Sequence, residues 1–203
     1  MNESFYNLPR EKQDTIINAA LRVFAKYDYK KATTDEIVKE AGISKGLLFH
    51  YFENKKGLYL FLYDYSVRFI REEMKRHMDN RETDFFEILK QSQIQKCETM
   101  KRHPFLYAFV MKLYYEEAPV VHKEVSGKNY GLIERSIEAV AARADTSRFK
   151  EDVDVRKLLQ IILWCAEGFM KEKIHMENMD IDILNQEFLE VLESFRRYVY
   201  KEE

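Results

Sequence analysis

The sequence predicts an all-helical protein of about nine helices. Of its 203 residues, 46% are hydrophobic and 14% aromatic, which is enough to fill a sizeable core. Only six glycines and three prolines interrupt the chain. Apolar residues recur at spacings of three and four, the period of an amphipathic helix, and there is no sustained alternation of apolar and polar residues that would indicate strands.

The first helix is expected over residues 9–27. Pro9 suits the first turn of a helix, where its fixed φ fits and its missing N–H needs no partner. One apolar stripe then follows at helical spacing. It consists of Ile16, Ile17, Ala20, Leu21, Phe24 and Tyr27. A short polar turn over residues 28–31 ends this helix.

Residues 33–52 are expected to form two short helices separated by a tight turn. Thr33 with Glu36 fits a capping box, which marks a helix start. Gly42 stands where a left-handed residue would end that helix. Ser44 is a favourable N-cap for the second helix. This arrangement is typical of a helix-turn-helix, whose second helix can enter a DNA groove.

The second of these helices is expected to have an inner and an outer side. Leu48 and Phe52 are four residues apart, so they share the side that faces the core. The positions left for the flanks and the outer side are Lys45, Leu47, Phe49, His50 and Tyr51. Asn54 is expected to cap the next helix, whose first turn carries Lys55 and Lys56. Lysine is unfavourable at a helix N-terminus, and a phosphate partner would explain it.

This stretch resembles the DNA-binding domain of the TetR family of bacterial transcriptional regulators. The matching positions are Thr33, Thr34, Ile37, Ala41, Gly42, Ile43, Ser44, Lys45, Gly46, Leu48, Phe49, Tyr51, Phe52 and Lys55. The rest of the chain matches the family only in length and helical character. The resemblance implies a helix-turn-helix domain over residues 1–55 and a helical effector-binding and dimerisation domain over residues 56–203.

The resemblance also implies contacts with a double-stranded DNA operator. The implied contact residues are Thr33, Thr34, Ser44, Lys45, Gly46, Leu47, Phe49, His50, Tyr51 and Lys55. Lys45, Tyr51 and Lys55 suit phosphates, which position a protein on the duplex without reading its sequence. Leu47 and Phe49 can make only apolar contacts, for example with a thymine methyl group. For His50 the alternative is a solvated surface residue.

Six more helices are expected after the helix-turn-helix. Their approximate ranges are 55–79, 84–102, 104–117, 119–144, 152–177 and 182–200. Pro104 and Pro119 can each start a helix. Ser126 and Gly127 mark a point where the helix over residues 119–144 could be interrupted.

The last helix carries an apolar seam in a 4-3-4-3 pattern, which is typical of helix-on-helix packing. The seam consists of Leu184, Phe188, Val191, Phe195 and Tyr198. The helix before it is apolar nearly all round between residues 158 and 166, which indicates burial on several sides. Together with the resemblance, this predicts a homodimer interface of four helices. The alternative is that both helices pack only within one chain.

The second half of the chain is rich in aromatic residues and methionine. These residues are typical of any helical core, but the resemblance implies a ligand pocket among the fifth to eighth helices. The candidate lining residues are Met100, Phe105, Phe109, Tyr114, Tyr130, Trp164 and Phe169. Such a pocket would suit an unknown lipophilic or aromatic effector. The candidate partners for a cationic group are Glu98, Glu116, Glu134 and Glu167.

Other kinds of chemistry find little support in the sequence. Residues 42–46 satisfy G-x-S-x-G, but that hydrolase motif works only on a strand-to-helix turn. No cysteine and histidine set has zinc spacing, so no metal or cofactor is expected. Cys97 and Cys165 are expected to be reduced thiols. No apolar run approaches the roughly 20 residues that cross a membrane. We therefore expect a soluble, cytoplasmic protein that is not an enzyme.

The sequence thus predicts a ligand-responsive transcriptional regulator, most simply a repressor, that binds a palindromic operator as a homodimer. Two alternatives remain open. One is a protein-interaction module whose helix-turn-helix does not bind DNA, and the other is a helical hydrolase. The net charge of −2 does not argue for DNA binding, so the prediction depends on residues 33–52.

Overall fold

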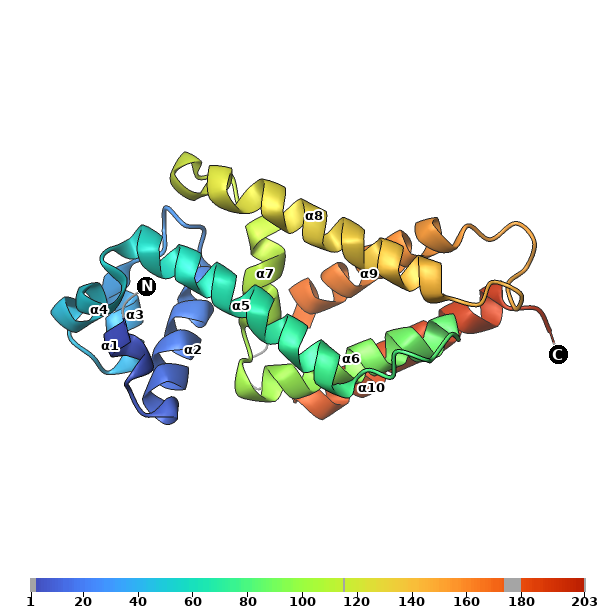
Figure 1. Cartoon of the computed structure of the whole chain (residues 1–203), viewed down its shortest axis with the longest axis horizontal. Helices are drawn as coiled ribbons and strands as arrows, with labels where there is room; N and C mark the ends of the chain where they lie inside the picture. Colours follow the sequence, from blue (N-terminus) through green and yellow to red (C-terminus); the bar gives the residue numbers. More distant parts are fainter. Residues whose placement is uncertain (1–2, 115, 174–179, 203) are drawn as a thin grey trace. The chain divides into compact units, whose positions relative to one another are not determined.

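The structure is a computed structural model that describes residues 3–114, 116–173 and 180–202. Within these ranges, the side chains at positions 77, 114, 126–130, 132 and 133 are not described. The described residues form an all-helical fold, as predicted (Figure 1). Its helices are α1 (Glu3–Tyr6), α2 (Arg10–Lys26), α3 (Thr34–Ala41), α4 (Lys45–Phe52), α5 (Lys55–His77), α6 (Phe85–Arg102), α7 (Leu106–Tyr114), α8 (Pro119–Arg143), α9 (Val155–Lys173) and α10 (Ile181–Val199).

The described helix ends agree with the sequence prediction to within a few residues, with two differences, and the end expected near residue 177 lies outside the described residues. The short helix α1 was not predicted, although the apolar Phe5 lies in it. The helix expected to start at Pro104 starts instead at Leu106, after a turn in which the Leu106 N–H donates to the His103 carbonyl at 3.1 Å. Helix α8 runs without interruption through positions 126 and 127.

The chain forms two compact units. The first contains Met1–Arg71 and Thr99–Tyr130, and the second contains Glu72–Glu98 and Gly131–Glu203. Helices α5, α6 and α8 each contribute residues to both units. The compact units therefore group residues differently from the functional division expected at residue 55.

The first unit has an aromatic core on which the helix-turn-helix packs. Phe5 is almost fully buried. Its ring centroid lies 5.0 Å from that of Phe52 and 5.2 Å from that of Phe61. The chain ahead of Pro9 is thereby fixed to α4 and α5. In the sequence, the only indication of this packing was the aromatic pair Phe5 and Tyr6. Two residues are too few to show the period of a helix.

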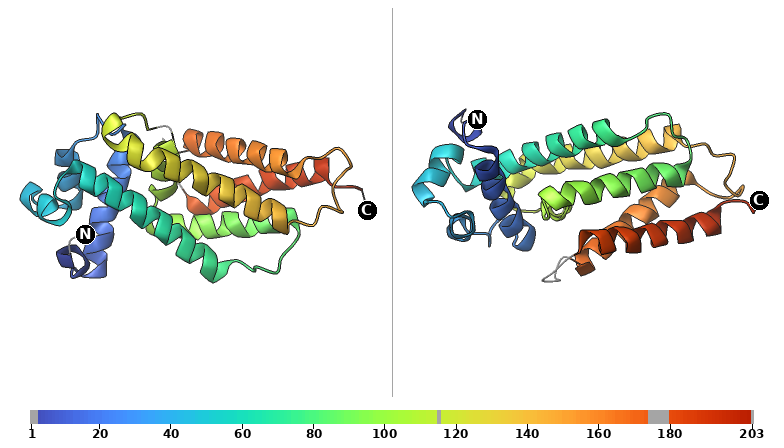
Figure 2. Two further views of the ribbon diagram at one scale, coloured as in Figure 1. Left: turned by 45° about the horizontal axis from the view of Figure 1, so that its top comes forward. Right: turned by 90° about the horizontal axis from the view of Figure 1, so that it is seen from below.

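The second unit is built around α9 and α10, which lie side by side (Figure 2). Its core is a cluster of buried apolar residues. They are Phe85, Phe86, Phe149, Leu158, Leu159, Ile162, Phe188, Leu192 and Tyr200. Phe149 and Tyr200 form an isolated antiparallel bridge, which holds the end of α10 against the loop before α9.

In the first unit, α7 is joined to α2 through the corner between α6 and α7. Arg102 binds both carboxylate oxygens of Asp14, with donor–acceptor distances from 2.8 to 3.0 Å. The amide nitrogen of Asn18 donates to the Arg102 carbonyl oxygen at 3.0 Å. The corner therefore has two polar attachments to one face of α2.

The fully buried His103 completes this polar network. Its Nδ1 lies 2.7 Å from Asn18 Oδ1, and its Nε2 lies 2.7 Å from the Tyr65 hydroxyl. Because the Asn18 amide nitrogen already donates to Arg102, Asn18 Oδ1 is an acceptor and His103 Nδ1 must donate to it. Nε2 then accepts from Tyr65, so the ring is neutral.

Burial lowers the pKa of His103 to about 4. The carboxylate of Asp14 opposes this shift, while the charges of Arg102 and Arg10 favour it. The low dielectric of the site penalises the imidazolium more than the neutral ring.

This shift predicts that the protein loses stability in mild acid. In the unfolded chain His103 takes up a proton near its ordinary pKa of 6.5, whereas in the folded chain it does so only near 4. The unfolded state binds more protons between these values, so stability falls as pH decreases through this window. The full loss is about 3 kcal/mol of unfolding free energy.

Urea unfolding at several pH values between 7 and 4 would measure this loss. The variant His103→Gln should be less stable at pH 7 and should lose less stability than the wild type on acidification. His50→Gln, at an exposed histidine of α4, is the matched control and should follow the wild-type curve. If the unfolding free energy of His103→Gln fell with decreasing pH as steeply as that of the wild type, His103 would not be the source of the acid sensitivity.

Candidate nucleic-acid interface

The two helices of the motif begin at the caps that the sequence predicts. The Thr33 hydroxyl oxygen accepts the Glu36 backbone N–H at 3.2 Å and donates to the Glu36 carboxylate at 3.0 Å. The Ser44 hydroxyl oxygen accepts the Leu47 backbone N–H at 3.1 Å. Each cap satisfies a backbone donor that has no partner within its helix.

The turn between the helices depends on Gly42. This residue has φ 64° and ψ 33°, the left-handed conformation in which a Cβ atom is unfavourable. Its N–H donates to the Val38 carbonyl, and the Ile43 N–H donates to the same carbonyl at 3.1 Å. The turn therefore ends α3 and directs the chain into α4.

The inner side of α4 is as expected. Leu48 is fully buried and Phe52 nearly so. Asn54 caps α5 by accepting the Gly57 N–H at 2.9 Å. A Cβ atom at Gly57 would lie 2.2 Å from the Phe52 carbonyl oxygen, so only glycine lets α5 begin this close to the end of α4.

The outer side of α4 presents a lysine, a histidine, a glycine and a leucine. Lys45, Gly46, Leu47 and His50 are all exposed. Lys45 Nζ lies 2.9 Å from an Asp35 carboxylate oxygen, an ion pair that the sequence analysis did not anticipate. Because both partners are at the surface, the pair is weak and a phosphate can displace the carboxylate.

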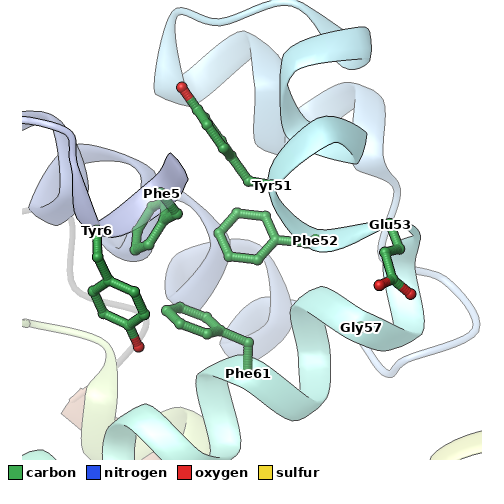
Figure 3. Close-up of a pocket in the computed structure, with 7 residues that line it drawn as sticks. All are labelled: Phe5, Tyr6, Tyr51, Phe52, Glu53, Gly57 and Phe61. Atoms are coloured by element: carbon green, nitrogen blue, oxygen red, sulfur yellow. The ribbon is translucent and has the colours of Figure 1, made fainter. Parts of the chain in front are cut away.

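Two predicted contact residues of α4 are less exposed than expected. Phe49 is half-buried, and Tyr51 is only 8% exposed. The Tyr51 ring lies edge-on to Phe5, with 5.7 Å between ring centroids. In Figure 3 its hydroxyl points away from the rings of Phe5 and Phe52. Of Tyr51, we therefore expect only the hydroxyl to be available to a phosphate.

A shallow pocket of about 180 Å³ lies beside Tyr51 (Figure 3). Its lining residues are Phe5, Tyr6, Tyr51, Phe52, Glu53, Gly57 and Phe61. The rings of Phe5, Phe52 and Phe61 pack on one another, with centroids 4.9 to 5.2 Å apart. Because these rings already pack on one another, the pocket is a shallow surface depression over the core of the motif.

Lys55 has an internal role that the sequence did not reveal. Its Nζ donates to the Tyr29 carbonyl at 2.6 Å and to the Ala32 carbonyl at 2.9 Å. It also lies 4.4 Å from the centroid of the Tyr29 ring. Burial lowers the pKa of Lys55, and the carboxylate of Glu116 opposes this shift. Two of its three N–H groups are thus used within the protein, which leaves one for a phosphate.

Lys56 is also paired within the protein. Its Nζ lies 2.7 Å from a carboxylate oxygen of Glu124 on α8. The unfavourable lysines in the first turn of α5 are therefore explained by internal partners. Of the other predicted contacts, Thr33 is exposed and Thr34 is half-buried.

The residues predicted to line an effector pocket lie in different surroundings. Met100 and Phe109 are fully buried, and Phe105 is half-buried beneath the Arg22 guanidinium. Phe169 packs against Phe188, whereas Trp164 is 61% exposed. The predicted side chains at positions 114 and 130 lie outside the described residues. A second pocket, of about 340 Å³ between α6 and α10, has none of the seven in its lining.

The predicted dimer seam on α10 is largely used within the chain. Leu184 and Phe188 are buried, and Val191 and Phe195 are half-buried. Only Tyr198 is fully exposed, at 77%. Periodicity identified the apolar stripe correctly, but it does not say whether the stripe packs on the same chain or on another.

The structure rejects the hydrolase alternative for residues 42–46. Ser44 caps a helix that follows another helix, so there is no strand-to-helix turn to expose it as a nucleophile. Among the described residues, no cluster of three acidic, cysteine or histidine side chains could hold a metal ion. In the same part of the chain, every helix is too short or too polar to cross a membrane.

The motif has clear relatives among known proteins. Residues 16–61 match the family model for bacterial regulatory proteins of the tetR family. The chain is 37% identical over 65 residues to the uncharacterized HTH-type transcriptional regulator YerO of Bacillus subtilis (strain 168), covering 32% of this chain and 22% of YerO. It is 36% identical over 80 residues to the HTH-type transcriptional activator FasR of Mycolicibacterium smegmatis, covering 37% of this chain and 36% of FasR.

Solved structures share the fold along nearly the whole chain. A TetR family transcriptional regulator from Chloroflexus aurantiacus matches with a TM-score of 0.66 and 21% identity, covering 98% of each chain. CprB of Streptomyces coelicolor, solved in complex with its operator, matches with a TM-score of 0.70 and 20% identity, covering 94% of this chain and 89% of CprB. Residues 16–61 are thus similar to the DNA-binding part of tetR-family regulators, and the fold of solved TetR regulators extends along nearly the whole chain.

Proposed function

We propose that the protein is a DNA-binding transcriptional regulator that binds a palindromic operator as a homodimer. The observation that carries this proposal is the pair α3 and α4, joined by the left-handed turn at Gly42, with Lys45, Leu47 and His50 on the exposed side of α4. A helix presented in this way fits the major groove. Regulators of the tetR family are not enzymes, and we propose no catalytic activity for this protein. We expect it to act in the cytoplasm, because bacterial DNA lies there.

A dimer would explain the apolar residues that remain exposed on α9 and α10. Ile161, Trp164 and Gly168 share one face of α9, and Ile183 is an exposed apolar residue at the start of α10. A tryptophan that is 61% exposed is costly in water and typical of an interface. We therefore place the dimer contact on these residues and Tyr198 rather than on Leu184 and Phe188. Two recognition helices about 34 Å apart would then meet successive major grooves.

We further propose repression as the default action, with release by a small lipophilic or aromatic effector. Occupying an operator blocks transcription without any contact to the polymerase, so repression demands the least of the protein. The related FasR is described as an activator, so the direction of control needs its own measurement. Solved neighbours include a fatty acid degradation regulator and a γ-butyrolactone receptor, which favours an apolar ligand. Such a ligand would act through its differential affinity for two conformations.

Replacing Lys45 tests the DNA interface. Binding of the wild type to a random-sequence duplex should weaken steeply with salt, because counterions are released from neutralised phosphates. In Lys45→Ala the slope of log K against log salt should fall by about 1, since one phosphate contact is lost. Fluorescence anisotropy with a labelled duplex over a range of salt concentrations gives both slopes.

The matched control is Lys75→Ala, an exposed lysine on α5 outside the motif. Its salt slope should equal that of the wild type. A wild-type protein that shows no salt-dependent binding to duplex DNA would favour the protein-interaction module instead.

Replacing Trp164 tests the dimer face. A glutamate there would bury a charge in an apolar interface, so Trp164→Glu should convert the dimer to a monomer without unfolding it. Sedimentation equilibrium measures the mass, and circular dichroism checks the helix content. Ala142→Glu, at an exposed position of α8, is the control for an added charge. A Trp164→Glu variant that remains dimeric would place the interface elsewhere.

A further inference from the structure

Glu116 lies between α7 and α8 and has no part in the predicted DNA contacts. The sequence offered it only as one of four candidate partners for a cationic ligand group. The structure instead buries its side chain, which is 7% exposed, inside the first unit. A buried carboxylate is costly unless its oxygens accept hydrogen bonds, so its partners indicate why it is there.

Both carboxylate oxygens of Glu116 accept hydrogen bonds from the protein. One oxygen accepts the Ala118 backbone N–H at 2.8 Å, which fixes the carboxylate to the start of α8. The other accepts the Tyr29 backbone N–H at 3.0 Å and lies 3.4 Å from the Tyr59 hydroxyl. Burial and the neighbouring Glu116 carboxylate raise the pKa of Tyr59, so its hydroxyl stays protonated and donates.

Tyr29 belongs to the short loop that leads into α3. Its N–H is held by Glu116, and its carbonyl is held by Lys55. Lys55 also holds the carbonyl of Ala32, the residue directly before the cap of α3 at Thr33. The peptide groups that set the direction of α3 are thus fixed from two sides, by a carboxylate and by an ammonium group.

An ion pair also joins α7 to the loop before α3. Lys112 on α7 lies 3.2 Å from an Asp28 carboxylate oxygen. Asp28 is largely exposed, so this pair contributes less than the buried carboxylate. Of these two polar contacts between α7 or its C-terminal corner and the loop before α3, the one made by Glu116 is the buried one.

We propose that Glu116 is a positioning residue for DNA recognition, which holds the helix-turn-helix in its operator-binding orientation from the corner between α7 and α8. The inference rests on the proposed DNA-binding function. Glu116 lies outside the motif, but it would contribute to how well the motif distinguishes one DNA sequence from another. Reading base edges requires α4 to be placed accurately, whereas attraction to phosphates does not.

The variant Glu116→Gln tests this role with almost no change in shape. The amide keeps one acceptor but turns an N–H₂ group toward a backbone N–H donor, so one buried hydrogen bond is lost. The probes are a duplex selected by the wild-type protein from a random-sequence pool, and a random duplex of the same length. Binding is measured by anisotropy at a temperature where circular dichroism shows each variant to be folded.

We expect Glu116→Gln to bind the selected duplex about tenfold more weakly than the wild type and the random duplex about equally. The exposed neighbour Glu117→Gln is the matched control and should keep the wild-type ratio between the two probes. A purely stabilising role would lower the melting temperature and leave this ratio unchanged, which would overturn the proposal.

If Glu116→Gln does not fold, Glu116→Asp decides the question. It keeps the charge but is one methylene too short to reach both Tyr29 and Ala118. A folded Glu116→Asp with a wild-type ratio would equally overturn the proposal, and a reduced ratio would support it. A wild type that selects no duplex from the pool would instead count against the proposed function itself.

Discussion

The left-handed turn at Gly42 is the constraint on which the proposed DNA-binding surface depends. With φ at 64°, this residue ends α3 and directs the chain into α4. A side chain there would cost roughly 1 kcal/mol or more in local strain. The caps at Thr33 and Ser44 fix where each helix begins, so the turn and the two caps together decide which residues of α4 face outward.

Directional polar contacts add to the aromatic core that packs around the motif. Asp14 and Asn18 join α2 to the corner before α7, and Tyr29 joins the loop before α3 to the corner after it. Helix α7 is thus attached near both of its ends to elements that carry the motif. These contacts are directional, so they fix the orientation of α7 in a way that apolar packing alone does not.

In the second unit, some apolar residues are buried in the core and others are exposed on the surface. Phe188 and Leu192 fill the core of the unit, while Trp164 and Ile183 remain exposed. An exposed apolar face is costly in water, and this cost is the basis of the homodimer contact that we propose for this unit. The helical period alone cannot separate the two groups, because both faces carry apolar residues.

The sequence by itself determined the features that depend on neighbouring residues. Most of the described helix ends, the caps at Thr33 and Ser44 and the turn at Gly42 are local in this sense, and they were predicted correctly. The tertiary structure alone decided the partners of side chains that reach distant parts of the chain. Lys55 binds backbone carbonyls before α3, and Phe188 packs within its own chain. These roles depend on which surfaces meet after folding, and helical spacing does not contain that information.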